Sequence, residues 1–210
     1  MLKDPFKLEK IAAKTWCGPG EKLLWRIGPR WGHVAFDIAG RRGAPHQHDG
    51  GTRSSTVPEW PLPTEAVATG RYHGDEWVHD PSIWAYVHAP HPSAVAAGCA
   101  DGLAAGQTDA WLVLSSQRLA VVVAASAIDE PAKKSGWLSR GKSEEEALRS
   151  LWEAPSAAIR HFGALQMGRE VEPVWIGQVA FQDGSTVLIR MENEVAAESV
   201  VTAGNAIFGG

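Results

Sequence analysis

The stretch DAWLVLSSQRLAVVVAA, residues 109–125, decides the fold class of this chain. Two apolar runs rich in valine and leucine flank the polar residues 115–118. Runs of this kind on both sides of a short polar break are typical of two strands covered on at least one face. The break lacks the Asn-Gly or Asp-Gly pair that marks the commonest hairpin turns, so the interpretation rests on the flanks. We predict a buried β-hairpin here.

A second hairpin is predicted for residues 174–191, VWIGQVAFQDGSTVLIRM. Asp183-Gly184 supplies the positive-φ geometry that a tight turn requires. Apolar residues alternate on both arms, and those expected to face the core are Trp175, Val179, Phe181, Val187, Ile189 and Met191. Asn193 can then cap a final helix. The predicted apolar face of that helix consists of Ala197, Val200, Val201, Gly204, Ile207 and Phe208.

The N-terminal part of the chain predicts a helix followed by strands. Asp4 is a candidate N-cap with Pro5 in the first helical position, and the glycines and proline of residues 17–20 end the helix. Strands are predicted at residues 21–27 and 33–38. Residues 40–74 are rich in glycine, proline, histidine and arginine, which favours a long loop or a mobile insertion.

An alanine-rich helix is predicted just before the first hairpin. Its glycines, Gly98, Gly102 and Gly106, recur every four residues and so lie on one side. Asp101 and the short length argue against a membrane helix, so we expect this small-residue face to dock closely on another element.

Residues 143–166 allow two interpretations. Residues 143–146 have the form of a capping box, which predicts a helix of about two turns. Residues 151–155 and 158–166 can instead be short strands, with Pro155 at an edge or a break.

Composition limits the possible partners and the cellular compartment. A chain of 210 residues is long enough for one domain with a substantial core. Its net charge of −4 disfavours a general role in gripping nucleic acid or an anionic membrane. Cys17 and Cys99 lie far apart, which disfavours a disulfide framework and fits a reducing cytoplasm. We expect no signal peptide, no transmembrane segment and a cytoplasmic location.

The elements EKLLWR, WLVLSSQRLAVVV, LWEAPSAAI and VAFQDGSTVLIRM, followed by a helix, resemble those of the bacterial pleckstrin-homology-like (PH-like) domains. Residues 115–119 and 183–185 carry most of the likeness. The resemblance implies a mainly β, α+β fold: an antiparallel barrel of about seven strands capped by a C-terminal amphipathic helix. It also implies an interaction scaffold without catalysis of its own.

The resemblance suggests one domain over residues 1–210, in which residues 21–27 and 109–208 form the PH-like barrel and C-terminal helix. Residues 1–20 add an N-terminal helix, and residues 28–108 form an insertion rich in histidine, glycine and proline. Phosphoinositide binding is not expected, because the basic residues near the first strands are scattered rather than clustered, namely Lys22, Arg26, Arg30, Arg41 and Arg42.

The first functional hypothesis is therefore a noncatalytic interaction module that binds a protein partner or a second copy of itself. The chain contains no nucleophile elbow, Walker loop, dinucleotide fingerprint or His-Glu-x-x-His helix, so an enzyme is disfavoured. An exposed sheet face, a strand edge or the insertion could supply the contact surface. The candidate contact residues are Trp60, Trp77, Trp84, Arg118 and Trp137.

The alternative is a metal-binding protein or metal-dependent hydrolase. Imidazoles and carboxylates gather in the insertion and could together hold zinc or another divalent ion. The candidate ligands are His46, His48, Asp49, His73 and His79. Convergence of at least three such side chains on one point is the geometry that this hypothesis requires.

Overall fold

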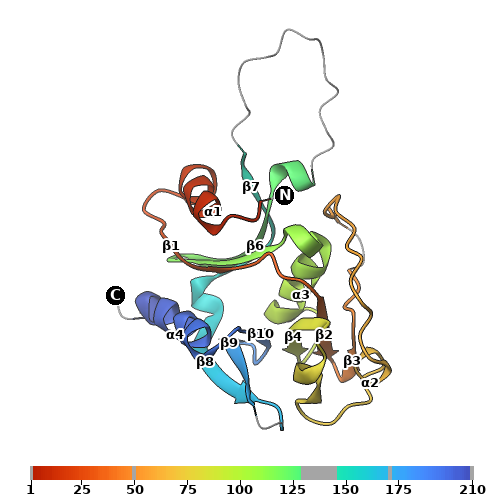
Figure 1. The fold of residues 1–210 in the computed structure, drawn as a ribbon. Helices are drawn as coiled ribbons and strands as arrows, with labels where there is room; N and C mark the ends of the chain where they lie inside the picture. Colours follow the sequence, from red (N-terminus) through yellow and green to blue (C-terminus); the bar gives the residue numbers. More distant parts are fainter. Residues whose placement is uncertain (1, 49–50, 129–145, 170–171, 209–210) are drawn as a thin grey trace, which may run out of the picture.

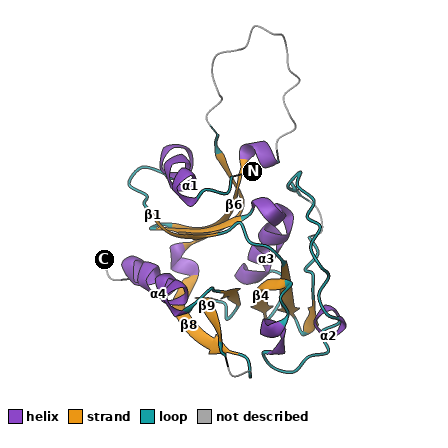
Figure 2. Cartoon of the chain, in the orientation of Figure 1, coloured by secondary structure: helices purple, strands orange, loops and turns teal. Residues whose placement is uncertain are grey.

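A computed structural model describes residues 2–48, 51–128, 146–169 and 172–208. Within these residues ten strands form two sheets, accompanied by α-helices and short helical turns (Figures 1 and 2). The expected fold class, mainly β with additional helices, is confirmed. The α-helices are α1 (Pro5–Ile11), α2 (Glu65–Ala68), α3 (Val95–Gly106) and α4 (Glu194–Phe208). No described helix has the length and apolarity needed to cross a bilayer.

The first sheet is an antiparallel meander. Its strand order is β1-β5-β6-β7, made by β1 (Leu23–Ile27), β5 (Trp111–Ser115), β6 (Arg118–Ala124) and β7 (Leu148–Pro155). The predicted first hairpin is β5–β6, with Trp111 opposite Val122 and Leu114 opposite Leu119. Of the two interpretations of residues 143–166, the strands are confirmed. The helix is wrong for residues 148–150, which lie in β7, and residues 143–145 lie outside the described part.

The second sheet has the order β3-β2-β4-β10-β9-β8. Its strands are β2 (His33–Ile38), β3 (Arg41–Gly43), β4 (Ile83–Ala89), β8 (Ile159–Met167), β9 (Val174–Phe181) and β10 (Thr186–Arg190). The second predicted hairpin, β9–β10, turns at Asp183-Gly184, where Gly184 has φ +83°. Of the side chains expected in its core-facing set, Val179, Phe181, Val187, Ile189 and Met191 are buried, and Trp175 is partly buried.

Two features of the second sheet depart from the expected closed antiparallel barrel. The sheets remain open, and β2 runs parallel to β4. The cause lies in residues 28–108, which add β2, β3 and β4 to the edge of β10. A parallel pair needs a long crossover, and residues 44–82 supply it.

Both faces of the β5–β6 hairpin are buried, which explains its unbroken apolar sequence. Leu112 and Leu114 on β5 face the interior between the two sheets, with Val121 on β6. Trp111 and Val113 point the other way, into a second cluster with Leu8 and Trp16 of the N-terminal helix. Each fully buried side chain of this size contributes roughly 1.5–3 kcal/mol. The helix around residues 5–16 is therefore required to cover the outer face of the first sheet (Figure 1).

The N-terminal helix begins as predicted. Asp4 accepts hydrogen bonds from the backbone amides of Phe6 and Lys7, and Pro5 occupies the first helical turn. The last turn, Ala12–Trp16, is a π-helix and ends at Cys17. At the other end of the chain, Asn193 caps α4 through the amide of Ala196, as predicted.

The apolar face of α4 is confirmed only in part. Ala197, Val200 and Gly204 are buried, whereas Val201 and Ile207 are partly buried. Phe208 was expected on the same face but is 52% exposed, because it lies in the last turn of the helix.

The small-residue face of α3 docks on the first sheet, as predicted. A Cβ atom added to Gly98 would lie 2.7 Å from Nε1 of Trp152, and one added to Gly102 would lie 2.9 Å from Cβ of Trp152 and 3.2 Å from Cβ of Val121. Distances this short leave no space for a methyl group. Glycine is thus required for the close approach of α3 to β6 and β7.

Gly102→Ala tests this packing because helix propensity and overpacking change the free energy of unfolding in opposite directions. In an uncrowded helix interior, alanine is about 1 kcal/mol more favourable than glycine. Here overpacking against Trp152 costs about 1–3 kcal/mol, so we expect a net loss of unfolding free energy in urea denaturation. A Val121→Ala background should relieve part of that loss. An increase in stability on Gly102→Ala would contradict the close docking of α3.

Candidate functional site

The histidines of the insertion do not gather at one point. His46 and His48 line a hollow beside α3, whereas His73 and His79 do not. The imidazole of His79 accepts a hydrogen bond from the amide of Arg169 at 3.2 Å, and the backbone amide of His73 donates to Glu76. Asp49 lies outside the described residues. In the described part of the chain, no three His, Cys, Asp or Glu side chains form a group that could hold a metal ion.

The candidate tryptophans occupy different environments. Trp77 is 1% exposed and stacks on Tyr86 with ring centroids 4.8 Å apart, so its ring belongs to the core instead of providing an exposed anchor. Trp84 is likewise 7% exposed. Trp60 is partly buried at the hollow, and its ring meets His33 edge to face at 5.3 Å. Trp137 falls outside the described residues.

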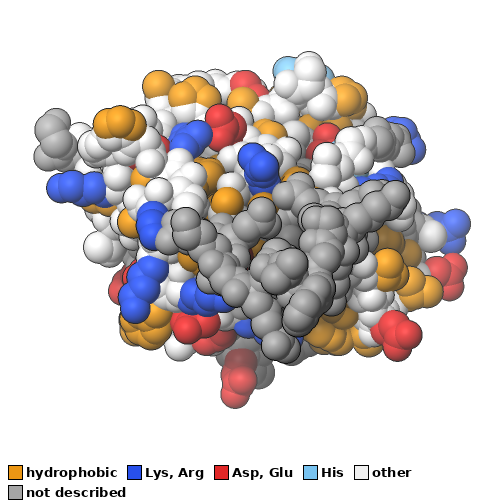
Figure 3. Space-filling view, turned by 90° about the horizontal axis from the view of Figure 1, so that it is seen from above, with side chains coloured by type: hydrophobic (Ala, Val, Ile, Leu, Met, Phe, Trp, Pro, Cys, Tyr) orange, Lys and Arg blue, Asp and Glu red, His pale blue; other side chains and the backbone are white. Residues whose placement is uncertain are grey.

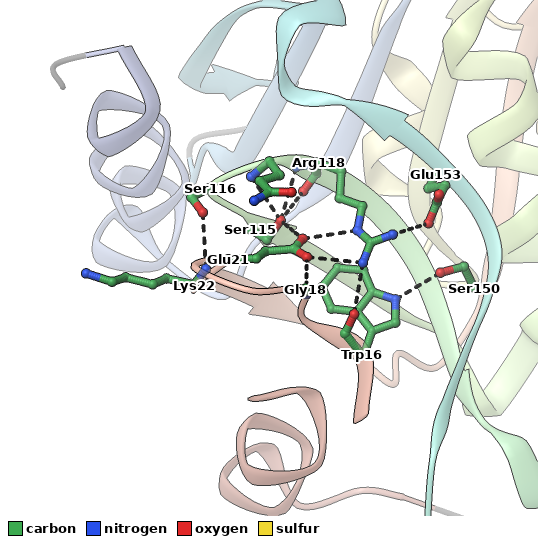
Figure 4. Close-up of polar contacts among 10 residues, drawn as sticks. Trp16, Gly18, Glu21, Lys22, Ser115, Ser116, Arg118, Ser150 and Glu153 are labelled. Carbon is green, nitrogen blue, oxygen red and sulfur yellow. Dashed lines mark hydrogen bonds and ion pairs between the residues drawn. The ribbon is translucent and has the colours of Figure 1, made fainter. Parts of the chain in front are cut away.

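Arg118, expected at a hairpin tip, is bound within the molecule. Its guanidinium contacts both carboxylate oxygens of Glu21, at 3.0 and 3.2 Å, and Glu153 at 2.9 Å (Figure 4). It also donates to the carbonyl of Trp16 and lies 4.3 Å from the centroid of that ring. These contacts connect the end of the N-terminal helix to the β5–β6 turn, so Arg118 has a structural role.

Glu21 is the buried partner in this cluster, with a side chain only 1% exposed. Burial opposes ionisation of the carboxyl group, but hydrogen bonds from Ser115, Gly18 and Arg118, together with the charge of Arg118, hold its pKa below the usual value. Ser115 donates to Glu21 at 2.5 Å and accepts from the amides of Gln117 and Arg118. The polar residues that interrupt the apolar hairpin thus form a turn held by hydrogen bonds to Ser115 and Glu21.

The hollow beside α3 is the candidate binding site of the insertion. It has a volume of about 220 Å³. Residues 51–64 form no helix or strand and run along α3 (Figure 1), but the loop predicted over residues 40–74 is wrong for β3 and α2, which form within it. The amide of Ser54 bonds the carbonyl of Ala105 at 2.9 Å, its hydroxyl bonds Asp109, and the amide of Ser55 bonds Ala127 at 2.7 Å. These bonds hold one wall of the hollow against the end of α3.

His46 is held in place at the hollow by two neighbours. Its Nε2 lies 2.7 Å from Oδ1 of Asp101 on α3, and its ring meets Phe36 edge to face at 5.3 Å. A carboxylate beside an imidazole fixes the orientation of the ring. The sequence pattern around Asp101 argues only against a membrane helix and does not predict this contact with His46.

Two lining residues have unpaired polar atoms that the sequence did not reveal. Nε2 of His48 and Oε1 of Gln107 are buried, and neither has a hydrogen-bond partner in the described structure. Gln107 follows α3 with φ +48° and ψ −126°, a backbone conformation that residues other than glycine rarely adopt. Backbone strain is concentrated at functional sites in proteins, and unpaired buried polar atoms are rare in native structures.

The free edge of β8 is a second candidate surface. Among the described strands, β8 ends the six-stranded sheet and pairs only with β9. Apart from β8, the edge strands of the two sheets are β3, with three residues, β1, with five, and β7, which ends at Pro155. β8 has nine residues and carries no proline or acidic residue. Its edge is thus the longest that another strand could join.

Aromatic side chains connect β8 to α4. Phe162 of β8 contacts Phe208 of α4 at a ring distance of 6.1 Å, and Phe208 is about half exposed. The exposed residues Arg160 and Arg169 lie at the two ends of the strand. Figure 3 shows another face of the molecule, over α1, where Lys and Arg side chains occur among Asp and Glu in its visible part.

No family model matches the sequence, and comparisons with curated proteins and with solved structures found no match.

Arg118→Met tests the structural role of the Glu21 cluster. Removing one member of a buried ion pair leaves the other charge uncompensated, so the free energy of unfolding should fall by about 3 kcal/mol. The matched control is Arg71→Met, because Arg71 and Glu65 are 3.9 Å apart and mostly exposed. That change should cost less than about 0.5 kcal/mol. Equal effects of the two substitutions in urea titrations would contradict the assigned role.

The lowered pKa of Glu21 predicts acid sensitivity. Because the folded pKa lies below the usual value of 4.5, this stabilisation is present above pH 4.5 and is lost as the pH falls through the folded pKa. Glu21→Gln should therefore be less stable at pH 7, with a shallower loss of stability between pH 5 and pH 3. Denaturation curves at several pH values measure both slopes. Parallel slopes in the two proteins would show that Glu21 contributes nothing to the acid response.

Proposed function

We propose that the protein is a noncatalytic, PH-like interaction module of the cytoplasm that binds an extended segment of a protein partner at the edge of β8. The order of elements supports the PH-like part of this proposal. In the described chain, β1, β5, β6 and β7 form one antiparallel meander, β8, β9 and β10 form another, and α4 follows. Seven strands and a C-terminal helix are the elements that the sequence resemblance implies.

The observation that carries the proposal is the free edge of β8. In the described structure, no hydrogen bond joins the outward-facing backbone groups of residues 161–167 to another element. An added strand would satisfy these groups by main-chain hydrogen bonding, which is a common mode of peptide recognition.

The chemistry around the edge indicates what the partner segment contains. Phe162 and the half-exposed Phe208 offer an apolar contact to side chains on one face of an added strand, which point to that face at every second position. Arg160 and Arg169 are exposed, and β8 itself has no acidic residue. The segment that fits best is therefore extended, about nine residues long, with apolar residues in alternation and acidic residues towards its ends.

Selection from a library of such peptides, followed by hydrogen exchange of the full-length protein, tests this proposal. Bound peptide should slow exchange at amides of β8 and leave β5 and β6 unchanged. Protection confined to another element, or selection of no peptide, would overturn it. If the protein instead dimerises without peptide in light scattering, with the same protection of β8, the segment bound at this edge belongs to a second copy of the chain.

Proline substitutions provide a matched pair of variants. Ala164 and Leu165 are adjacent, so their amides point to opposite sides of β8. Proline is tolerated where the amide points outward and destabilises the strand where the amide bonds β9. Of Ala164→Pro and Leu165→Pro, the variant whose replaced amide points outward should keep its stability and lose peptide binding by at least about tenfold. Unchanged affinity in that variant would exclude strand addition.

A further inference from the structure

The hollow beside α3 indicates a ligand of limited size. Its volume of about 220 Å³ is several times the roughly 30 Å³ that one water occupies in the liquid. It is smaller than the roughly 300–1,000 Å³ of pockets that take drug-sized molecules. A molecule with a single ring fits between these limits.

The charge of the lining favours an anion. Arg53 lines the hollow, and none of the described residues of the lining is an Asp or Glu. The guanidinium donates one bond, through Nη2, to the carbonyl of His48, which orients it and leaves further N–H donors for a ligand. His46 is already paired with Asp101. A planar carboxylate is the anion that a guanidinium fork binds best at this size.

The walls favour a flat ring. Trp60, Trp84 and the imidazole of His33 all line the hollow. His33 is fixed by the carbonyl of Pro61, 3.0 Å from its Nε2, and by its edge-to-face contact with Trp60. Aromatic side chains prefer offset-stacked or edge-to-face contacts with another ring.

The unpaired atoms favour a ligand that also carries a hydrogen-bond donor. Oε1 of Gln107 is an acceptor, and Nε2 of His48 is a donor or an acceptor according to the tautomer. A buried polar atom without a partner lowers the stability of the folded protein. A ligand O–H or N–H group that bonds such an atom breaks no existing protein hydrogen bond. It therefore contributes more to the binding affinity than the same bond would at a solvated site.

From size, charge, walls and unpaired atoms together, we propose that this hollow binds a single-ring aromatic carboxylate bearing a hydroxyl or amino group. The carboxylate lies at Arg53, the ring lies against Trp60, and the ring substituent points towards Gln107. This binding goes beyond the proposed peptide recognition, because no residue of β8 lines the hollow.

The test uses the full-length protein and three probes of similar size. We expect 4-hydroxybenzoate to bind with a dissociation constant of roughly 0.1–1 mM, in the range for a ligand of about ten non-hydrogen atoms. Cyclohexanecarboxylate keeps the charge without the aromatic ring, and 4-hydroxybenzyl alcohol keeps the ring without the charge. Each should bind at least about tenfold more weakly in calorimetry and in saturation-transfer NMR.

Matched variants locate the site. Trp60→Leu and Arg53→Gln should each weaken 4-hydroxybenzoate about tenfold. Trp31→Leu and Arg71→Gln are the controls and should change nothing, because Trp31 and Arg71 are exposed and do not line the hollow. Gln107→Gly should weaken binding without lowering the melting temperature, since glycine relieves the backbone strain. This last variant separates a binding role from a folding role.

The proposal is overturned if 4-hydroxybenzoate does not bind at 10 mM, if cyclohexanecarboxylate binds equally well, or if the Trp60 and Arg53 variants retain full affinity. Each result is independent of peptide binding at β8, so failure at one surface is distinguishable from failure at the other.

Discussion

The two-sided burial of the β5–β6 hairpin is the constraint on which the rest of the structure depends. Every residue of these strands except Arg118 is buried. A sheet that is apolar on both faces needs a separate cover for each face. The N-terminal helix covers the outer face, whereas α3, α4 and the second sheet enclose the inner one. Segments at both ends of the chain and in its middle therefore pack against the two faces of one hairpin.

The same constraint explains the polar features next to the hairpin. Covering the outer face brings the end of the N-terminal helix against the β5–β6 turn, where backbone groups and the Glu21 carboxylate become buried. Ser115 and Arg118 provide the hydrogen bonds that these buried groups require. Arg118 is thus explained by folding. The candidate binding chemistry lies elsewhere, at the edge of β8 and in the hollow along α3.

The insertion has two roles that its composition did not separate. Its strands β2, β3 and β4 extend the second sheet, and Trp77 and Trp84 are buried on them or beside them. Its irregular segment, residues 51–64, is held against α3 and forms one wall of the hollow. The sequence correctly placed strand β2, whereas the loop predicted over residues 40–74 is interrupted by β3 and α2. It did not reveal the parallel pairing of β2 with β4, because the choice of strand partner depends on residues about fifty positions away.

The sequence by itself determined the two hairpins, the capped helices at both ends and the need for close packing of α3. Each of these follows from periodicity, turn chemistry or residue size acting over a few neighbouring residues. Only the tertiary structure decided that both sheets stay open, that Glu21 is buried and that the edge of β8 is free. It alone also brought His33, Arg53, Trp60 and Gln107 around one hollow. These features depend on contacts between segments that are distant in the sequence. The local sequence pattern around a residue does not predict such contacts.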